Sequence, residues 1–429
     1  MKFSRVFLKS KEEEELRRGF PWVFDNEISF IKVATDKGYI QQELEDCTLE
    51  NGLPVEVYSK GGLFLGSGIY NKKSKITVRI LSRNSCESIF GKEASTLIPS
   101  SLHSQDTRTF FQKNIETAYE ARFLFYSKND SYRLIFGEAD FIPGFICDRF
   151  CDINGRVFLV VQFLSLSAEV FRSELIDGLR TVCRPFAIYE RSDASVRELE
   201  GLELKKGWIG SEQDPIITIR ENGVLISIDL ENGQKTGYFL DQKDNRKLVA
   251  SLAKGKRVLD TFCHTGAFGL NAVAGGAKSV VAVDISESAI SNTEMNIGLN
   301  KAGCVMKVMC IDVFELLRKF EASGEKFDMI ILDPPAFAKS ASRVQKAYGG
   351  YKEINLRAMN LLESGGILVS CSCSHFFDAQ RFYGMLHSAA IDAKRSIQIL
   401  KKRGAGPDHP VLCGYPKSEY LKCVVMRVI

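Results

Sequence analysis

Residues 258–269 have the sequence VLDTFCHTGAFG, in which a short apolar run ends at Asp260 and a turn follows. Gly266 of this turn has no side chain, so the backbone can bend sharply there and approach a ligand closely. Further apolar runs follow at 280–284, 305–311, 329–332 and 367–370. Segments with helical spacing separate these runs, a pattern that predicts a parallel sheet covered by helices on both faces. We therefore expect an α/β, Rossmann-like domain with a mainly parallel sheet over residues 201–429.

The residues before this domain predict two smaller units. Residues 1–83 predict a β-rich unit, because short strand-like runs with turn residues between them lie at 54–58, 63–70 and 76–81. Residues 84–200 predict a small α+β unit, in which we find no set of catalytic side chains. The first unit also has a basic segment, formed by Lys72, Lys73, Lys75 and Arg79. Charge alone fits an RNA-binding surface less well than an ordinary solvated face.

The composition is that of a soluble globular protein with two or three domains. The chain has 429 residues, of which 45% are hydrophobic and 26% charged, and its formal net charge is +4. No apolar run approaches the ~20 residues that span a bilayer, and no signal peptide begins the chain, so we expect a cytoplasmic protein without a membrane partner. The twelve cysteines form no paired framework, and Cys371 and Cys373 have C-x-C spacing, so we expect free thiols and no metal site.

Three acids end successive predicted strands, where ligands bind in sheets of this kind. Asp284 would accept hydrogen bonds from both hydroxyls of a ribose, and Asp312, which precedes an apolar pair, suits an adenine. Asp260 would repel a diphosphate but attract an ammonium group, and residues 266–269 lack the leading glycine of a dinucleotide fingerprint. The set favours S-adenosylmethionine (SAM) over a nicotinamide cofactor, although each acid alone could equally be a helix cap.

Residues 331–337, ILDPPAF, follow the fourth predicted strand and supply a candidate catalytic acid, Asp333. The two prolines stiffen the loop and leave its carbonyl groups free to accept hydrogen bonds. The run is similar to the Asp-Pro-Pro-aromatic signature of methyltransferases that act on planar nitrogens, except that Phe337 comes one residue late. An ordinary turn after a strand is the plainer alternative.

Residues 370–375, SCSCSH, end the fifth predicted strand beside this loop. A cysteine in this place suits the methylation of cytosine at C5, because a thiolate that adds to C6 makes C5 nucleophilic. Only a few per cent of an ordinary thiol is ionised at neutral pH, so the site must favour the thiolate. We expect Cys371 to be buried packing, and His264 and His375 to be structural.

Together these motifs resemble the RlmI family of class I methyltransferases, which form 5-methylcytosine in the large-subunit ribosomal RNA of bacteria. The resemblance extends over nearly the whole chain, and its most specific run is NGQKTGYFLDQ at 232–242, with Arg246 after it. Other matching runs are FLK at 7–9, GFPWVF at 19–24, GYKEIN at 350–355, SCS at 372–374 and DHP at 408–410. The resemblance implies a PUA-like RNA-binding domain at 1–83, a small α+β domain at 84–200 and a methyltransferase domain at 201–429.

The resemblance also implies roles for single residues. Cys373 is the expected nucleophile, and Asp333 is the expected acid that steadies the target base. The expected SAM-binding residues are Asp260, Thr265, Gly266, Asp284, Asp312, Phe239, Gln242 and Asp333. Pro335 stands where a related family of RNA cytosine methyltransferases has a second cysteine, so another base would have to release the product.

The sequence therefore predicts methyl transfer from SAM to C5 of a cytidine in 23S ribosomal RNA, and it is compatible with a homodimer. One alternative is methylation of an exocyclic base nitrogen through the Asp333 loop, with Cys373 idle. An alternative of another class is a non-catalytic RNA-binding or ribosome-assembly factor that keeps SAM only as a structural ligand.

Overall fold

A computed structural model describes residues 3–338 and 340–429 of the chain. The chain folds into two compact units. Unit 1 comprises Met1–Pro215, Asp229–Tyr238 and Pro407–Ser418, and unit 2 comprises Ile216–Ile228, Phe239–Gly406 and Glu419–Ile429. The chain therefore passes from one unit to the other several times.

Unit 2 is built on a seven-stranded sheet with the order β17-β16-β15-β18-β19-β21-β20. Its strands are β15 (Arg257–Thr261), β16 (Ser279–Asp284), β17 (Met306–Cys310), β18 (Phe327–Leu332), β19 (Leu362–Ser372), β20 (Ile397–Arg403) and β21 (Lys422–Val428). The first five are parallel to one another, whereas β21 runs antiparallel to both of its neighbours, β19 and β20. This confirms the predicted α/β, Rossmann-like domain with a mainly parallel sheet.

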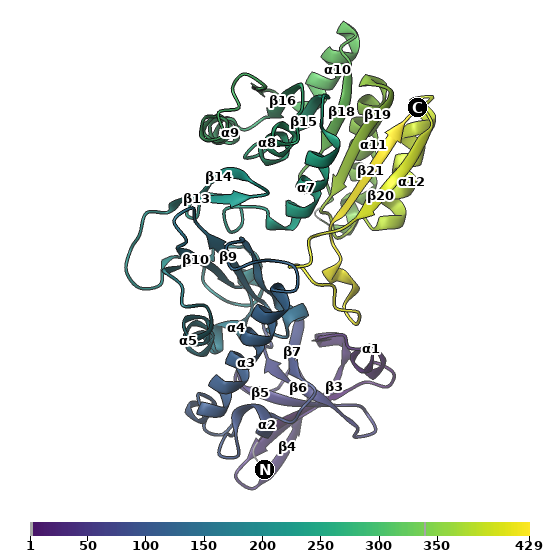
Figure 1. Ribbon diagram of the computed structural model, residues 1–429. Coiled ribbons are helices and arrows are strands. Elements are labelled where there is room, and N and C mark those ends of the chain that lie inside the picture. The colour runs from purple at the N-terminus through teal and green to yellow at the C-terminus, as the bar shows by residue number, and fades with distance from the viewer. Residues whose placement is uncertain (1–2, 339) are drawn as a thin grey trace. The chain divides into compact units, whose positions relative to one another are not determined.

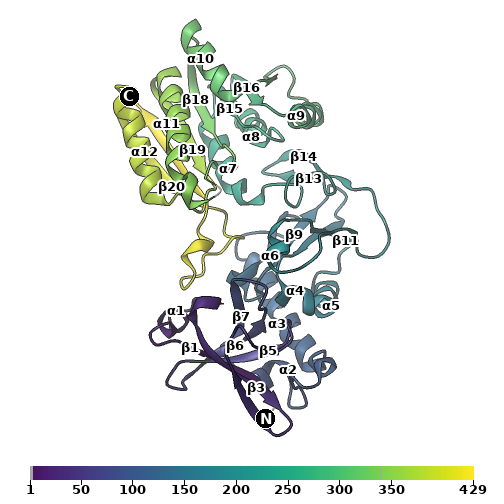
Figure 2. The same cartoon turned by 180° about the vertical axis from the view of Figure 1, so that it is seen from behind.

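Helices connect the five parallel strands of unit 2: they are α8 (Ala267–Ala274), α9 (Glu287–Leu299), α10 (Val313–Ser323) and α11 (Val344–Leu361). Helix α7 (Lys243–Leu252) precedes β15, and α12 (Ala379–Asp392) connects β19 to β20. In both views α11 and α12 lie alongside β19 and β20 (Figure 1, Figure 2). Leu316, Ile354 and Met385 of α10, α11 and α12 belong to one buried apolar cluster with the strands. Because the five strands are parallel, the loops that follow them meet at one edge of the sheet.

A hairpin precedes this sheet, as the Asn222-Gly223 pair predicts. Its strands are β13 (Ile216–Glu221) and β14 (Val224–Asp229), which form a two-stranded sheet. Asn222 and Gly223 both have positive φ, 52° and 88°, which is the backbone of the tight turn that suits strand twist. No helix in the described parts of the chain is both long and apolar enough to cross a membrane.

Unit 1 begins with a seven-stranded sheet in the order β2-β7-β6-β5-β1-β3-β4. The three predicted runs form β5 (Pro54–Tyr58), β6 (Phe64–Tyr70) and β7 (Ile76–Ser82). The other strands are β1 (Ser4–Leu8), β2 (Trp22–Phe24), β3 (Ile28–Thr35) and β4 (Gly38–Gln42). Val6, Leu8 and Ile31 of β1 and β3 are fully buried, whereas Arg5 and Lys32, which point to the opposite face, are partly exposed.

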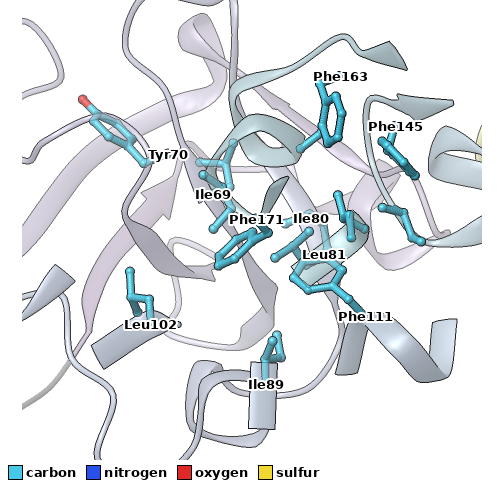
Figure 3. Close-up of a cluster of buried hydrophobic side chains, with 14 of the residues drawn as sticks. Ile69, Tyr70, Ile80, Leu81, Ile89, Leu102, Phe111, Phe145, Phe163 and Phe171 are labelled. Carbon is cyan, nitrogen blue, oxygen red and sulfur yellow. The ribbon is translucent and has the colours of Figure 1, made fainter. Parts of the chain in front are cut away.

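A second sheet of unit 1 has the order β12-β11-β10-β9-β8. Its strands are β8 (Tyr132–Phe136), β9 (Phe145–Cys151), β10 (Val157–Phe163), β11 (Ala187–Ser192) and β12 (Lys205–Trp208), and its main helices are α3 (Gln105–Arg122) and α5 (Arg172–Cys183). Side chains from both sheets and from α3 share one core, which includes Ile80 of β7, Phe111 of α3 and Phe145 of β9 (Figure 3). The two halves of unit 1 are therefore packed as one body.

The basic segment of unit 1 does not form one solvated face. Arg79 is buried, and its guanidinium pairs with Glu138 at 3.0 Å and with Glu200 at 2.8 Å. Lys72 is exposed, but its ammonium donates to the carbonyl oxygen of Glu45. The assignment of Arg79 to a solvent-facing or RNA-binding surface was therefore wrong, because a residue in a strand can point inward and be neutralised there.

Candidate active site

Asp260, at the end of β15, is a buried carboxylate with one unsatisfied oxygen. Oδ2 accepts a hydrogen bond from the backbone N–H of Gly269 at 2.8 Å. Oδ1 is buried and has no hydrogen-bond partner among residues 3–338 and 340–429. Burial raises the pKa of Asp260 to about 8, and the charges of Asp333 and Asp284 add to that shift. An ammonium group beside Oδ1 would satisfy this oxygen and favour the ionised form.

The turn after β15 brings the backbone close to helix α9 and to the end of β16. Gly266 has φ of 73°, and a Cβ there would lie 2.5 Å from Cγ2 of Thr293, so no other residue fits without movement. The carbonyl oxygen of the buried Thr265 accepts from the side-chain amide of Asn296 at 2.9 Å. Asp284, at the end of β16, accepts from the backbone N–H of His264 at 3.0 Å. The loop is thus held rigidly against its neighbours.

Asp312 has the role that the sequence left open as an alternative. It caps helix α10, because its Oδ1 accepts a hydrogen bond from the backbone N–H of Glu315 at 3.0 Å. This contact uses one oxygen only, so a contact with an adenine amino group stays a prediction. Ile285, which directly follows Asp284, is 67% exposed, an uncommon state for an isoleucine at the end of a sheet strand. Its position suits a flat apolar wall, and sequence analysis did not single it out.

The segment of Phe239 and Gln242 reaches two of the predicted site loops. The ring of Phe239 meets His264 edge-on, with ring centroids 5.0 Å apart. The side-chain amide of Gln242 donates to Oδ1 of Asp333 at 3.0 Å, and its oxygen accepts from Asn245 at 2.7 Å. The family-specific run therefore ends in residues that touch both the turn after β15 and the Asp333 loop.

The Asp333 loop and the end of β19 are fastened together. Strands β18 and β19 are parallel neighbours, with Leu332 opposite Ser370. The hydroxyl of Ser374 donates to the carbonyl oxygen of Ala338 at 2.7 Å. The hydroxyl of the buried Tyr351 accepts from Ser372 Oγ at 3.0 Å and from the Phe337 N–H at 3.5 Å.

These bonds keep Cys373, which lies between Ser372 and Ser374, beside the Asp333 loop. Cys373 is partly exposed, whereas Cys371 is fully buried, and burial together with the neighbouring Cys423 raises the pKa of Cys371 well above its usual range. A partly exposed thiol can meet a substrate, whereas a buried one with a raised pKa is inert. His375 lies over the ring of Tyr420 at 5.3 Å between centroids.

Two further residues near Cys373 were not assigned a site role from the sequence. Tyr351 belongs to the run at 350–355, which lies within α11. Lys422 opens β21 and pairs with Ser372 across the antiparallel ladder. No local pattern marks Lys422, because only strand pairing brings it to this place. Among the described residues, no group of three or more His, Cys, Asp or Glu side chains is arranged to hold a metal ion.

Comparisons with known proteins match this architecture. Residues 203–412 match the family model described as S-adenosylmethionine-dependent methyltransferase, and residues 6–83 match a PUA-like domain. The chain is 38% identical over 429 residues to ribosomal RNA large subunit methyltransferase I of Tolumonas auensis, covering 99% of each chain. It is 37% identical over 422 residues to the protein of that name from Photobacterium profundum, covering 97% of each. A solved structure of a candidate SAM-dependent methyltransferase from Streptococcus mutans shares the fold, with a TM-score of 0.76, 20% identity and 99% coverage of both chains.

Proposed function

The chain belongs to the ribosomal RNA large subunit methyltransferase I family, and from that premise we propose that it transfers a methyl group from SAM to C5 of a cytidine in 23S ribosomal RNA. The observation that carries this proposal is the place of Cys373, a partly exposed thiol on a strand end fastened to the Asp333 loop. A methyltransferase that acts on a nitrogen has no use for a thiol there. Such an RNA substrate also fits a protein that works in the cytoplasm.

The residues at the ends of β15 and β16 fit SAM. The unsatisfied Oδ1 of Asp260 would accept from the ammonium of the methionine moiety. Gly266 and Thr265 would present their backbone to it, and Asp284 would accept from the ribose hydroxyls with lone pairs that the loop leaves unused. Asp312 and Phe239 would line the remainder of the pocket. When bound, SAM supplies an electrophilic methyl group on a sulfonium.

The protein residues then act on the cytosine ring. The thiolate of Cys373 adds to C6, which places electron density on C5. Oδ1 of Asp333 is oriented by Gln242, and the carboxylate would accept a hydrogen bond from the exocyclic amino group. C5 takes the methyl group, a base removes the proton from C5, and the C6–S bond breaks to restore the thiolate. The target base has to leave its stack first, at a cost of a few kcal/mol.

The outer face of the N-terminal sheet offers a surface for RNA, within the region 1–83 that we propose as the PUA-like domain. Phe7 stacks on Phe30 with centroids 4.7 Å apart and on Tyr58 at 5.4 Å. Lys32 lies 5.1 Å above the ring of Phe7, and Arg5 lies 5.3 Å above that of Tyr58. Phe7 is buried, but Phe30 and Tyr58 are partly exposed, and exposed rings next to cations suit a single strand, because bases stack on rings and phosphates attract cations.

The proposal is tested by Cys373→Ser together with nucleoside mass spectrometry of 23S ribosomal RNA treated with each enzyme. The wild type should form 5-methylcytidine, and the variant should form none while it binds SAM with near wild-type affinity. A methylated exocyclic nitrogen in the product, formed equally by both proteins, would favour the nitrogen-directed reaction. RNA binding without any methyl transfer would point to a non-catalytic factor.

A further inference from the structure

Lys422 is a buried lysine held against the backbone next to Cys373. It lies opposite Ser372 in the β19–β21 ladder, with 7% of its surface exposed. Its ammonium donates to the carbonyl oxygen of Ser374 at 2.6 Å and to that of Tyr420 at 2.7 Å. Among the residues that the structure describes, its third N–H has no acceptor. A lysine is seldom buried without a partner of opposite charge, because removing its ammonium group from water is costly.

The charged groups around Lys422 are acids and the thiol of Cys373. Burial lowers the pKa of Lys422 to about 8, and the charges of Cys373, Asp378 and Glu419 oppose that shift. The other titratable groups near this end of β19 are Tyr351, whose pKa is raised to about 12 by burial, His375 over Tyr420, the neighbouring thiols of Cys371 and Cys423, and Asp333 of the adjoining loop. No carboxylate forms a salt bridge with the ammonium within the described residues. Of the three charges that act on Lys422, that of Cys373 has the largest effect, and it is the one whose ionisation the proposed reaction requires.

We propose that Lys422 is a positioning residue that stabilises the thiolate of Cys373 and fixes the Ser374 carbonyl so that the thiol faces the Asp333 loop. A cation near a cysteine favours the ionised thiol, and its effect is large where water is scarce. Both hydrogen-bond acceptors of the ammonium are neutral carbonyl oxygens, and Asp378 and Glu419 act on it only through longer-range charge, so no salt bridge draws it away from the thiol. The role of this thiolate in catalysis rests on the function proposed above.

The test measures the ionisation of the thiol rather than turnover. The rate at which iodoacetamide alkylates Cys373 is followed against pH by peptide mass spectrometry, which separates it from the other cysteines. In Lys422→Met the midpoint of this profile should rise by about one pH unit. Lys422→Arg keeps the charge and should lie close to the wild type. Lys401→Met, which removes an exposed lysine of β20, is the matched control and should leave the midpoint unchanged.

The outcomes separate this inference from the proposed function. An unchanged midpoint in a folded Lys422→Met protein would overturn the inference even if the wild type forms 5-methylcytidine. A shifted midpoint in a protein that forms no 5-methylcytidine would support the inference and defeat the proposed reaction. If Lys422→Met does not fold, the alkylation profile of the wild type decides. A midpoint for Cys373 near that of a free thiol would show that Lys422 does not stabilise the thiolate. Loss of activity in Lys422→Met should be partly reversed at higher pH, as a purely structural defect would not be.

Discussion

Gln242 donates a hydrogen bond of 3.0 Å to Oδ1 of Asp333, joining the end of the most family-specific run to the loop that follows β18. Gln242 is itself held by Asn245, whose side-chain oxygen accepts from Arg403 at 2.8 Å. Three side chains from two segments therefore fix the orientation of one carboxylate. Such a chain suits a group that must meet a substrate atom in one direction.

Replacement of Gln242 by Leu should slow methyl transfer without abolishing it. Leucine keeps the volume but removes the donor to Asp333, and one hydrogen bond to a charged group is worth about 1.5–3 kcal/mol, or roughly a tenfold to hundredfold loss in rate. The rate of methyl transfer is measured in single-turnover experiments with labelled SAM, and the SAM affinity is determined separately. Gln398→Leu, at an exposed position of β20, is the control. An unaltered single-turnover rate would remove Gln242 from the catalytic arrangement.

Asp260 should make the stability of the ligand-free protein depend on pH. Its pKa is raised from 3.8 to about 8, so between these values the folded protein holds a proton that the unfolded chain has lost. Stability from this group is therefore complete below about pH 4 and declines as pH rises toward 8. Asp260→Asn cannot lose a proton, so its melting temperature relative to the wild type should increase across this window. If the melting temperatures of the two proteins changed with pH in parallel, the raised pKa of Asp260 would be contradicted.

SAM should act on the same residue in the opposite direction. An ammonium group beside Oδ1 favours the carboxylate, so saturating SAM should lower the pKa of Asp260 and flatten the pH dependence of the wild type. Asp260→Asn keeps the hydrogen-bonding shape but loses the charge, and its SAM affinity should fall by about tenfold or more. Calorimetry of SAM binding at two pH values checks this.

Those parts of the fold that follow from the local pattern of apolar and polar residues could be predicted from the sequence. Strands β15, β16, β18 and β19 contain buried apolar runs, because helices cover them, and the proposed site acids stand at or near the ends of strands. Strand β20 was missed because its exposed edge position leaves it charged, with Lys401, Lys402 and Arg403 in its second half. Helix α3 was missed because most of its surface is polar and only a narrow stripe, which includes Phe111 and Ile115, is buried.

The site shows the same division between local and tertiary information. Asp260, Asp333 and Cys373 could be named from the sequence, since each lies at or just beyond the end of a predicted strand. Tyr351 and Lys422 could not be assigned, because one comes from a helix and the other from an antiparallel strand that only folding brings to Ser372. The capping bond of Asp312 was foreseen only as an alternative, since caps and ligand contacts use the same residue type at the same place.

Gly266→Ala should weaken SAM binding, and backbone strain alone should not account for this loss of affinity. The new methyl group would meet Thr293 at 2.5 Å and Met306 at 3.2 Å, and the residue would keep a left-handed backbone with φ of 73°. Gly276→Ala is the matched control, because Gly276 also has positive φ, 86°, but its nearest neighbour would lie 3.7 Å away. Both variants should lose about 1–2 kcal/mol of stability from the backbone. Only Gly266→Ala should also lose SAM affinity, and equal affinities in the two variants would argue against a cofactor contact at this turn.

Arg5 and Lys32 should contribute both to the affinity for RNA and to the dependence of that affinity on salt concentration. Each cation that meets a phosphate releases counterions, so removing one should reduce the slope of log affinity against log salt by about 0.7 for a single strand. Glu56 lies 3.7 Å from Arg5 and offsets part of its charge, so Lys32→Ala should have the larger effect. Lys113→Ala, on the exposed side of α3, removes a cation away from this sheet face and should leave the slope unchanged. Equal slopes for Lys32→Ala and Lys113→Ala in a filter-binding titration would place the RNA elsewhere on the protein. If Phe30→Ala also weakens binding but leaves the slope unchanged, the ring contributes by stacking on a base rather than by supporting Lys32.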